Sequence, residues 1–246
     1  MFVEAIVPAA GLGVRMKSFL PKPLVKIGKK PVIIHTLEAL AKNRDIKRIL
    51  VAVSPDNLNR FKEVISGYKI GKSLSFVAGG RTRRDSVENC LKEIFGETDF
   101  VLIHDAVRPF ISQGLISRLI AEAKKSRAVI CGVPVKATIK KVAVRRPSSV
   151  VRSLTVAQTL DRENVWEIQT PQVFAKSLLT AAYKRYANRA VTDDASLVEK
   201  MGQKVKVIEG SYFNIKITTP EDLILAKAIL KNLLPSLRAP KGRSNL

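Results

Sequence analysis

The chain contains few residues that serve as covalent nucleophiles or soft metal ligands. Its 246 residues include two cysteines, Cys90 and Cys131, and two histidines, His35 and His104. The cysteines lie far apart, without metal-ligand spacing or nearby histidines, which argues against a metal-thiolate site and predicts two reduced, buried thiols. The sequence has neither a Gly-x-Ser-x-Gly motif nor a cysteine beside a histidine. We therefore expect the attacking group of any transfer reaction to come from a substrate.

Long apolar runs are also missing. No apolar stretch approaches the span of a bilayer, and no basic region precedes the apolar residues of the N-terminal MFVEAIVPAAGLG. With 46% hydrophobic and 26% charged residues, the chain has enough apolar material to form a core over most of its length. The sequence predicts a folded, soluble, cytoplasmic protein with neither a secretion signal nor a membrane span.

Acidic residues are scarce relative to basic ones. The 43 Lys and Arg outnumber the 21 Asp and Glu, for a formal net charge of +22. Such a charge favours polyanions as ligands or neighbours, although a basic proteome or a solvated cationic surface explains it equally well. A nucleic-acid-binding protein is thus an alternative, but aromatics make up only 6% and no DNA- or RNA-recognition signature occurs. We expect nucleic-acid binding to be weak and non-specific at most.

Short β-rich runs alternate with segments of helical periodicity. We predict strands over 2–7, 48–53, 74–78, 100–103 and 128–133, and helices over 32–41, 57–65, 86–94 and 115–123. Because the strands are apolar on both faces, this alternation predicts an α/β fold with a Rossmann-like, mostly parallel twisted sheet covered by helices on both faces. Ligands of such sheets bind beyond the carboxyl ends of the strands. Four polar motifs, PAAGLG, SPDN, GGRTRRDS and HDAVRP, each follow a predicted strand, so we expect them to share one cleft.

The segment 136–160 breaks the alternation. Its Val, Leu and Ile alternate with basic residues, Ser and Thr, which predicts a two-stranded β-arm. An arm of this size has too little core to be stable alone, so we expect it to pack on a second copy of the chain in a homodimer. Residues 1–135 and 161–234 are predicted to form a single α/β domain that closes with a helix from Pro220, and the basic tail 235–246 is predicted to be disordered.

A glycine-rich loop follows the first strand. Its small residues allow backbone N–H groups to approach phosphate oxygens, and its cations can neutralise charge that shifts during phosphoryl transfer. The loop matches neither the dinucleotide fingerprint nor the Walker motif. Taken alone, it can equally be an ordinary strand-to-helix turn with solvated cations. The candidate phosphate-binding residues are Ala9, Ala10, Gly11, Gly13, Arg15 and Lys22.

Two further motifs follow predicted strands. In HDAVRP, Asp105 comes directly after a strand, where a carboxylate can bind a Mg²⁺ that bridges phosphate oxygens, or can cap the next turn. We expect His104 to be a buried core histidine. In GGRTRRDS, Gly80 permits close approach to a base edge and Ser86 can begin a helix, while the three arginines can equally be surface charge.

The chain resembles the 2-C-methyl-D-erythritol 4-phosphate cytidylyltransferase family in an ordered set of motifs. These are PAAGLGVRM followed by PKPL, then GGRTRRDSV, HDAVRP, TLDRENVWEIQTPQVF, TDDAS and NIKITTPEDL, across roughly residues 2–232. The resemblance implies a homodimer that makes 4-diphosphocytidyl-2-C-methyl-D-erythritol from CTP and methylerythritol phosphate in the non-mevalonate isoprenoid pathway, with release of pyrophosphate. It also implies an arm that reaches into the partner's site.

The resemblance also implies roles for individual residues. Arg15 and Lys22 match the family's catalytic cations on the triphosphate, and Arg162 and Lys216 match those that position the acceptor phosphate. Further contacts to the acceptor are implied for Thr138, Arg108 and Thr170. The cytidine-binding edge corresponds to Ala9, Ala10, Gly11, Gly80, Ser86 and Ala106, and the Mg²⁺ site to Asp105.

Three positions depart from the family pattern. Arg81 stands where family members often carry an acidic residue, although the contacts at this position are made largely by the backbone. Pro23 replaces the usual Gln, and Ala137 replaces a common Asp. These departures do not affect the assignment of CTP as the nucleotide, but they weaken the assignment of methylerythritol phosphate as the acceptor. The nearest alternative is the related ribitol 5-phosphate cytidylyltransferase, which shares the loop and HDAVRP-like motifs and differs mainly in its pocket for the alcohol.

Overall fold

The computed structural model describes residues 1–11, 20–145, 153–187 and 191–236. These residues form a seven-stranded sheet with the order β11-β7-β10-β6-β1-β4-β5. All strands run parallel except β10, which is antiparallel to both of its neighbours. The predicted α/β fold with a mostly parallel sheet is confirmed. The strands are β1 (Val3–Pro8), β4 (Ile46–Val53), β5 (Ser73–Ala78), β6 (Phe100–Ile103), β7 (Ala128–Pro134), β10 (Trp166–Ala175) and β11 (Lys206–Glu209).

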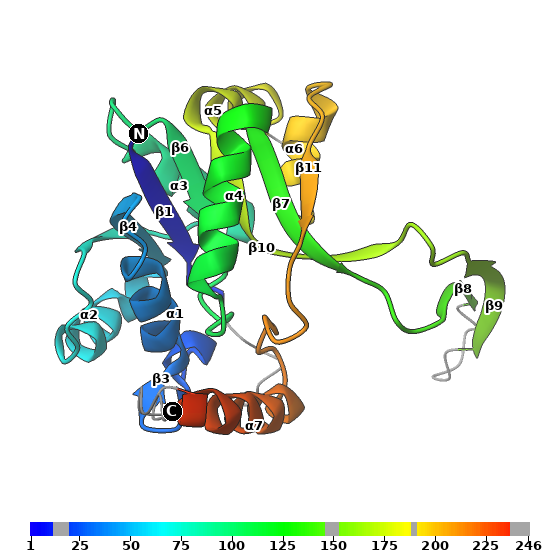
Figure 1. Ribbon diagram of the computed structural model, residues 1–246, viewed down its shortest axis with the longest axis horizontal. Helices are drawn as coiled ribbons and strands as arrows, with labels where there is room; N and C mark the ends of the chain where they lie inside the picture. Colours follow the sequence, from blue (N-terminus) through cyan, green and yellow to red (C-terminus); the bar gives the residue numbers. More distant parts are fainter. Residues whose placement is uncertain (12–19, 146–152, 188–190, 237–246) are drawn as a thin grey trace, which may run out of the picture.

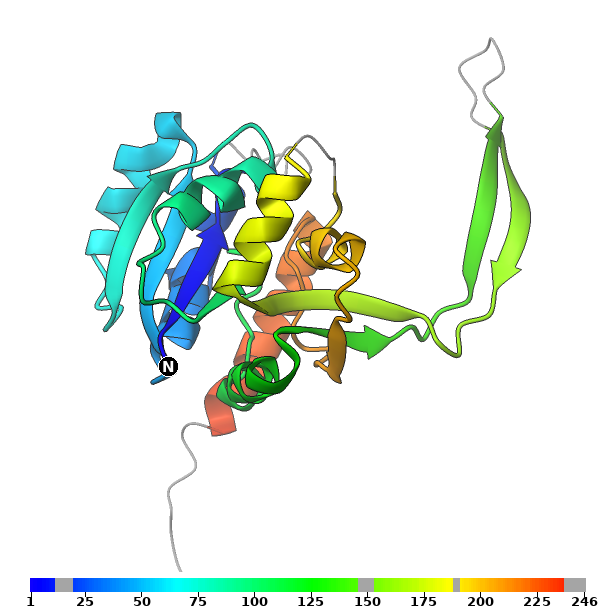
Figure 2. The same ribbon diagram turned by 90° about the horizontal axis from the view of Figure 1, so that it is seen from above.

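Helices cover both faces of this sheet (Figures 1 and 2). One face packs against α1, α2 and α4, and the other against α3, α5 and α6. No helix of the described part of the chain is long and apolar enough to span a bilayer. The helices on the faces are α1 (Val32–Ala41), α2 (Leu58–Ser66), α3 (Arg83–Lys92), α4 (Gln113–Ser126), α5 (Lys176–Arg185) and α6 (Ala195–Lys200).

The central strands are apolar on both faces because both faces are covered. In β1, Ala5 and Val7 pack in the cluster with α1, whereas Ile6 packs in the cluster with α3. All three side chains are fully buried. Burying a side chain of the size of Val or Ile contributes roughly 1.5–3 kcal/mol, so the two layers of helices together stabilise the sheet.

The strand β10 was not predicted from the sequence. It lies in the middle of the sheet, although its sequence WEIQTPQVFA contains a proline, which argues against a central strand. The register with β7 shifts between Gln169 and Gln172, so the segment around Pro171 is left out of the ladder. Because this irregularity accommodates the missing N–H group, the proline is tolerated.

The closing helix α7 (Pro220–Ser236) begins at the residue predicted from the sequence. Asp222 donates its N–H to Thr219 Oγ1 at 3.4 Å, and the Asp222 carboxylate accepts the N–H of Thr219 at 2.9 Å. This reciprocal pair caps the first turn. Near the ends of the strands, Ala226 of α7 packs with Ile27 in a small apolar cluster. Ile27 belongs to a short hairpin of β2 (Lys26–Ile27) and β3 (Lys30–Pro31).

The predicted arm forms an antiparallel ribbon of β8 (Ile139–Arg145) and β9 (Ser153–Leu160) that is not part of the main sheet. It projects from the α/β body in both views (Figures 1 and 2). Val142 pairs with Val156 across the ribbon, and both side chains are exposed, as is Leu154. The use of this ribbon in a homodimer stays a prediction.

Candidate active site

A pocket of about 500 Å³ opens beyond the carboxyl ends of β1, β5 and β6. The motifs that follow these three strands share it, as predicted, while the Ser-Pro-Asp-Asn turn after β4 does not line it. The short 3₁₀ helix η2 (Lys22–Leu24) adds residues from a second side. The described lining consists of Pro8, Ala9, Ala10, Gly11, Lys22, Pro23, Gly80, Arg81, Thr82, Arg83, Ser86, Asp105, Ala106, Val107, Lys216 and Thr218.

Small residues bring two backbone segments together at the back of the pocket. A Cβ atom added at Gly79 would lie 2.4 Å from the Cβ of Ala10, and one added at Gly80 would lie 2.2 Å from the Cβ of Asp85. Neither position can accept a side chain without displacement of its neighbour. Gly79 therefore lets the loop after β5 lie against the loop after β1, and Gly80 lets the same loop pack closely on Asp85 of α3.

The helix α3 starts beside these glycines. Thr82 and Asp85 form a capping box, so the helix begins at Arg83, three residues earlier than predicted. Ser86 Oγ accepts the N–H of Gly80 at 3.1 Å and donates to Thr82 O at 2.9 Å. The Ser86 side chain thereby shapes the turn that carries Gly80, and the amino end of α3 faces the pocket. Helix amino ends favour phosphate groups.

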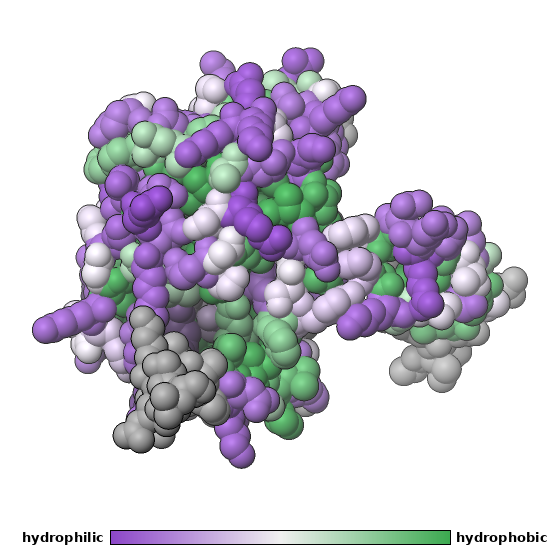
Figure 3. All heavy atoms as spheres, in the orientation of Figure 1, coloured by the Kyte–Doolittle hydropathy of each residue, from purple (hydrophilic) through white to green (hydrophobic). Residues whose placement is uncertain are grey.

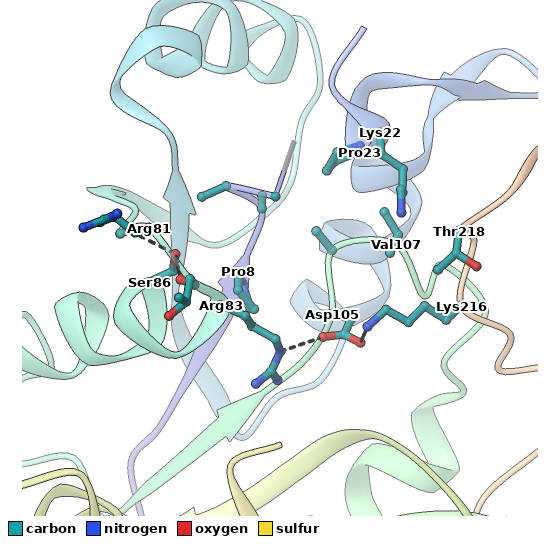
Figure 4. Close-up of a pocket in the computed structure, with 16 residues that line it drawn as sticks. Pro8, Lys22, Pro23, Arg81, Arg83, Ser86, Asp105, Val107, Lys216 and Thr218 are labelled. Carbon is teal, nitrogen blue, oxygen red and sulfur yellow. Dashed lines mark hydrogen bonds and ion pairs between the residues drawn. The ribbon is translucent and has the colours of Figure 1, made fainter. Parts of the chain in front are cut away.

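Asp105 follows β6 and is 6% exposed. Its Oδ1 lies 3.2 Å from Arg83 Nε, and its Oδ2 lies 2.8 Å from Lys216 Nζ and 3.6 Å from Arg108 Nε. Figure 4 shows Arg83 and Lys216 reaching this carboxylate from opposite sides. Burial works to raise the pKa of Asp105, but the three cations outweigh burial and hold this pKa well below its usual range. Asp105 therefore remains a carboxylate at neutral pH.

His104 is fully buried beneath Asp105, as predicted. Its Nε2 lies 3.0 Å from Arg108 O and its Nδ1 lies 3.1 Å from Thr170 Oγ1, which accepts the N–H of Asp105 at 3.0 Å. A carbonyl oxygen can only accept, so Nε2 carries the proton and Nδ1 accepts from the Thr170 hydroxyl. Burial lowers the pKa of His104 to about 4. The neutral ring holds the turn that presents Asp105.

Lys216 is held over the pocket by its neighbours in the NIKIT motif. The carbonyl of Asn214 accepts from Arg108 Nη1 at 2.6 Å, and Ile217 donates its N–H to Val107 O at 3.0 Å. Asn214 and Ile217 are fully buried, whereas Lys216 between them faces the pocket. The two residues that flank the lysine, Ile215 and Ile217, pack in one apolar cluster, which holds Lys216 at the pocket.

Most of the predicted site residues meet at this pocket. Gly13 and Arg15 lie outside the described residues. Arg108 and Thr170 are buried behind the pocket wall and do not line it, so their contact with an acceptor stays a prediction. The predicted residues that line the pocket are Ala9, Ala10, Gly11, Lys22, Gly80, Arg81, Ser86, Asp105, Ala106 and Lys216.

The remaining predicted residues, Thr138 and Arg162, lie at the root of the arm. Both are exposed, and the guanidinium of Arg162 donates to the carbonyl of Lys136. Neither lines the pocket of its own chain. Their predicted role therefore requires a second chain.

Of the described lining residues that were not predicted as site residues, Arg83 is the one that carries a charge. Arg83 was treated as possible surface charge, but its guanidinium joins Asp105 to Asp194, whose Oδ2 lies 2.8 Å from Arg83 Nη1. Arg83 belongs to GGRTRRDS and Asp194 to TDDAS, which are more than a hundred residues apart in the chain. The sequence marks both motifs but holds no signal for the contact between them.

The pocket offers a carboxylate suited to Mg²⁺. Asp105 alone is acidic among its described lining residues, and no cluster of three or more His, Cys, Asp or Glu occurs in the described chain. Mg²⁺ is usually held by one or two carboxylates together with substrate phosphates and water. A carboxylate has about four lone-pair sites, of which the three cations occupy at most three. The donor set fits a Mg²⁺ that takes its other ligands from a polyphosphate.

A cationic pocket beyond the ends of parallel strands, with a helix amino end and one carboxylate, defines an α/β nucleotidyltransferase type of site. The profile of the 2-C-methyl-D-erythritol 4-phosphate cytidylyltransferase family matches residues 3–232. The chain belongs to this family. Its relatives include an enzyme of that name from Bacillus mycoides, 41% identical over 227 residues, or 92% of this chain and 96% of the relative. Another, from Geobacillus kaustophilus, is 42% identical over 94% of this chain and 97% of the relative.

Solved structures agree with this assignment. The 4-diphosphocytidyl-2C-methyl-D-erythritol synthase from Anaerococcus prevotii is 34% identical, with a TM-score of 0.77. The match covers 94% of this chain and 98% of the chain of that enzyme. The 2-C-methyl-D-erythritol 4-phosphate cytidylyltransferase from Thermus thermophilus is 33% identical, with a TM-score of 0.72 over 94% of this chain and all of its own. The likeness therefore covers the fold as a whole.

Proposed function

We propose that this chain transfers a cytidylyl group from CTP to 2-C-methyl-D-erythritol 4-phosphate and releases pyrophosphate. Membership of the family over residues 3–232 carries this proposal. The pocket supports it, since its described lining combines backbone that can approach a nucleotide closely with the ammonium groups of Lys22 and Lys216. The related ribitol 5-phosphate activity is not favoured, because the family profile and the relatives carry the name of the methylerythritol enzyme.

The reaction needs no nucleophile from the protein. An oxygen of the acceptor phosphate attacks the α-phosphorus of CTP, the bond from that phosphorus to the bridging oxygen breaks, and pyrophosphate leaves. The second pKa of a phosphate monoester is about 6, so the acceptor is already ionised at neutral pH. This agrees with a site in which the histidine nearest to Asp105, His104, is buried and already fully hydrogen-bonded.

The cations of the pocket stabilise the charge that develops during transfer. Figure 4 shows the ammonium groups of Lys22 and Lys216 directed toward the same space beside Asp105, while Arg81 extends away from it. Lys22 follows the glycine-rich loop and is suited to the triphosphate, and Lys216 is suited to the acceptor phosphate. Cations placed beside the transferred charge lower the barrier because they stabilise the charge that develops in the transition state.

Asp105 is the residue that would hold Mg²⁺ in this scheme, together with oxygens of the triphosphate. The ion would supply Lewis-acid stabilisation of charge on the phosphates. Lys216 occupies Asp105 Oδ2 at 2.8 Å, so it would turn toward the acceptor phosphate when the substrates are bound. Loss of pyrophosphate release on chelation, with recovery on addition of Mg²⁺, is the expected result; full activity in chelator would contradict the metal requirement.

The chain is also proposed to act as a homodimer through its arm. The apolar residues Val142, Leu154 and Val156 share one face of the β8–β9 ribbon and are 44–62% exposed. Figure 3 shows apolar surface on the projecting arm. Thr138 and Arg162 at its root lie outside the pocket of their own chain. A partner that covers the apolar face of the arm would receive these two residues beside its pocket.

A competition experiment tests the choice of acceptor. Equimolar 2-C-methyl-D-erythritol 4-phosphate and ribitol 5-phosphate are incubated with limiting CTP, Mg²⁺ and the pure protein, and the CDP-linked products are separated. The ratio of the products equals the ratio of the two kcat/KM values, and we expect the methylerythritol product to exceed the other by roughly 100-fold. Formation of the ribitol product alone would overturn the proposed acceptor.

A further inference from the structure

Arg83 and Asp194 have no role in the proposed reaction, and the structure brings them into contact. Arg83 of GGRTRRDS donates from Nε to Asp105 Oδ1 at 3.2 Å and from Nη1 to Asp194 Oδ2 at 2.8 Å, where Asp194 belongs to TDDAS. One guanidinium is thus held between two carboxylates. The first of these carboxylates lines the pocket, and the second lies behind it.

Asp194 is an unusual place for a charge. It is 1% exposed, and its Oδ1 accepts the hydroxyl of Tyr183 at 2.5 Å. Although Asp194 stands at the cap position of α6, its side chain makes no capping hydrogen bond. A buried ion pair contributes little to stability, because loss of hydration offsets much of the attraction between the charges. Because burying the Asp194 carboxylate brings little stability, its presence beside Arg83 points to a functional role at the pocket.

The position of Arg83 is fixed from both ends. It is the first residue of α3 and lies within the capping box that Thr82 and Asp85 form, and its guanidinium is planar and always charged. Two of its nitrogens are committed to Asp105 and Asp194. Arg83 is held against the carboxylates and away from a phosphate in the middle of the pocket.

The charges around Asp105 explain what Asp194 does. Asp105 contacts three cations, Arg83, Arg108 and Lys216, which leaves an excess of two positive charges beside a carboxylate that would bind Mg²⁺. Asp194 lies against one of these cations and reduces the excess to one. We propose that Asp194 is a positioning residue that neutralises Arg83 and so keeps Asp105 competent to bind Mg²⁺. This inference rests on the proposed metal at Asp105.

The test measures how strongly a metal improves CTP binding. Calorimetry gives the Kd of CTP in chelator and in saturating Mn²⁺, without acceptor, and the quotient of the two is the metal enhancement. Asp194→Asn keeps the shape of the side chain and removes one negative charge, so the metal enhancement falls by about fivefold. Arg83→Gln removes one positive charge, so the enhancement stays equal or rises.

The double variant tests whether the two charges compensate each other. Asp194→Asn combined with Arg83→Gln restores the net charge beside Asp105, so its metal enhancement returns to within about twofold of the wild type. If the pair only stabilises the fold, Arg83→Gln lowers the enhancement as Asp194→Asn does, because each single change leaves one buried charge without its partner. Either that pattern or an unchanged Asp194→Asn would overturn the inference.

Two controls complete the experiment. Asp193→Asn makes the same chemical change one residue earlier, where the carboxylate pairs with Gln172 Nε2 at 2.8 Å instead of an arginine, and it should leave the enhancement within about twofold. Asp105→Asn should abolish the enhancement. If the metal enhancement is unchanged in Asp105→Asn, the proposed metal site itself is wrong. If it is unchanged in Asp194→Asn but lost in Asp105→Asn, the metal site is supported and the proposed role of Asp194 is wrong.

Discussion

Three cations contact the Asp105 carboxylate in the pocket. Lys216 is the most exposed of them. It is 41% exposed at its side chain, compared with 30% for Arg83 and 7% for Arg108. It can therefore leave Asp105 for a phosphate at little cost, whereas Arg83 and Arg108 are each held by a second contact, to the Asp194 carboxylate and to Asn214 O. The sequence predicted Lys216 and Asp105 as site residues, but it could not predict that they pair with each other.

Replacing Lys216 tests its predicted role at the acceptor. We expect Lys216→Met to lower kcat/KM for the acceptor phosphate by roughly 100-fold, because a fixed cation beside the transferred charge is lost. The Kd of CTP, measured without acceptor, should change much less. Lys227→Met on α7 is a matched control, since Lys227 is exposed and lies outside the pocket lining. Equal losses in both variants would remove Lys216 from the mechanism.

The buried His104 predicts how stability depends on pH. Burial lowers its pKa from 6.5 to about 4, so the unfolded chain binds more protons than the folded chain between these values. Its contribution to stability is complete above pH 6.5 and is lost as the pH falls toward 4, by up to about 3 kcal/mol.

Urea denaturation at several pH values checks this dependence. The free energy of unfolding of the wild type should fall more steeply between pH 6.5 and 5 than that of His104→Asn, which is less stable at pH 7 but has no imidazole to protonate at this position. Other groups titrate equally in both proteins. Parallel slopes would show that His104 does not carry the effect.

At the scale of elements, the structure explains which parts of the fold could be predicted from sequence. All five predicted strands occur, because each is a short apolar run that ends at a polar turn. The strand β10 was missed because Gln169, Gln172 and Pro171 interrupt its apolar pattern. These residues serve tertiary contacts: Gln172 Nε2 donates to Asp193, and Gln169 Nε2 donates to Ser211 O at 2.9 Å. Local periodicity cannot report such contacts.

The arm yields a prediction about assembly. Val156→Asp places a charge on the apolar face that Val142 and Leu154 share, so we expect light scattering to report monomers where the wild type is a dimer. Activity should fall with dimer content. Thr155→Asp places the same charge on the opposite face of β9 and should leave the dimer intact. Dimers in both variants would show that this face of the arm is not the interface.

Mixed dimers test whether the arm serves the partner's pocket. Arg162→Ala and Lys216→Ala are each expected to be nearly inactive, but a heterodimer of the two has one site in which both residues are intact. After random exchange of equal amounts, about a quarter of the wild-type activity should return. No recovery after exchange, or full activity of Arg162→Ala alone, would contradict a role for the arm in the partner's site.

At the scale of the whole molecule, function follows from where the parallel strands end. The motifs after β1, β5 and β6 lie far apart in the sequence and meet at one pocket because these strands run in the same direction side by side in the order β6-β1-β4-β5. That convergence was predictable from strand periodicity. The contribution of Arg83 and Asp194 was not, since it depends on a contact between residues that are 111 positions apart in the chain.

The net charge of +22 is larger than the pocket requires. The pocket contributes only a few of the 43 Lys and Arg residues, and nothing in the described structure assigns the others to a ligand. Figure 3 shows hydrophilic side chains over most of the visible face, with apolar surface on the arm and in the region of α7. The charge therefore does not bear on the choice of reaction.

The most direct measurement of the central claim follows CTP by ³¹P NMR in the presence of the protein, Mg²⁺ and 2-C-methyl-D-erythritol 4-phosphate. We predict that CTP signals are replaced by those of pyrophosphate and a CDP-linked diphosphate diester in equal amounts, and that neither product forms without the acceptor. Release of inorganic phosphate, or consumption of CTP that does not depend on the methylerythritol phosphate, would contradict the account.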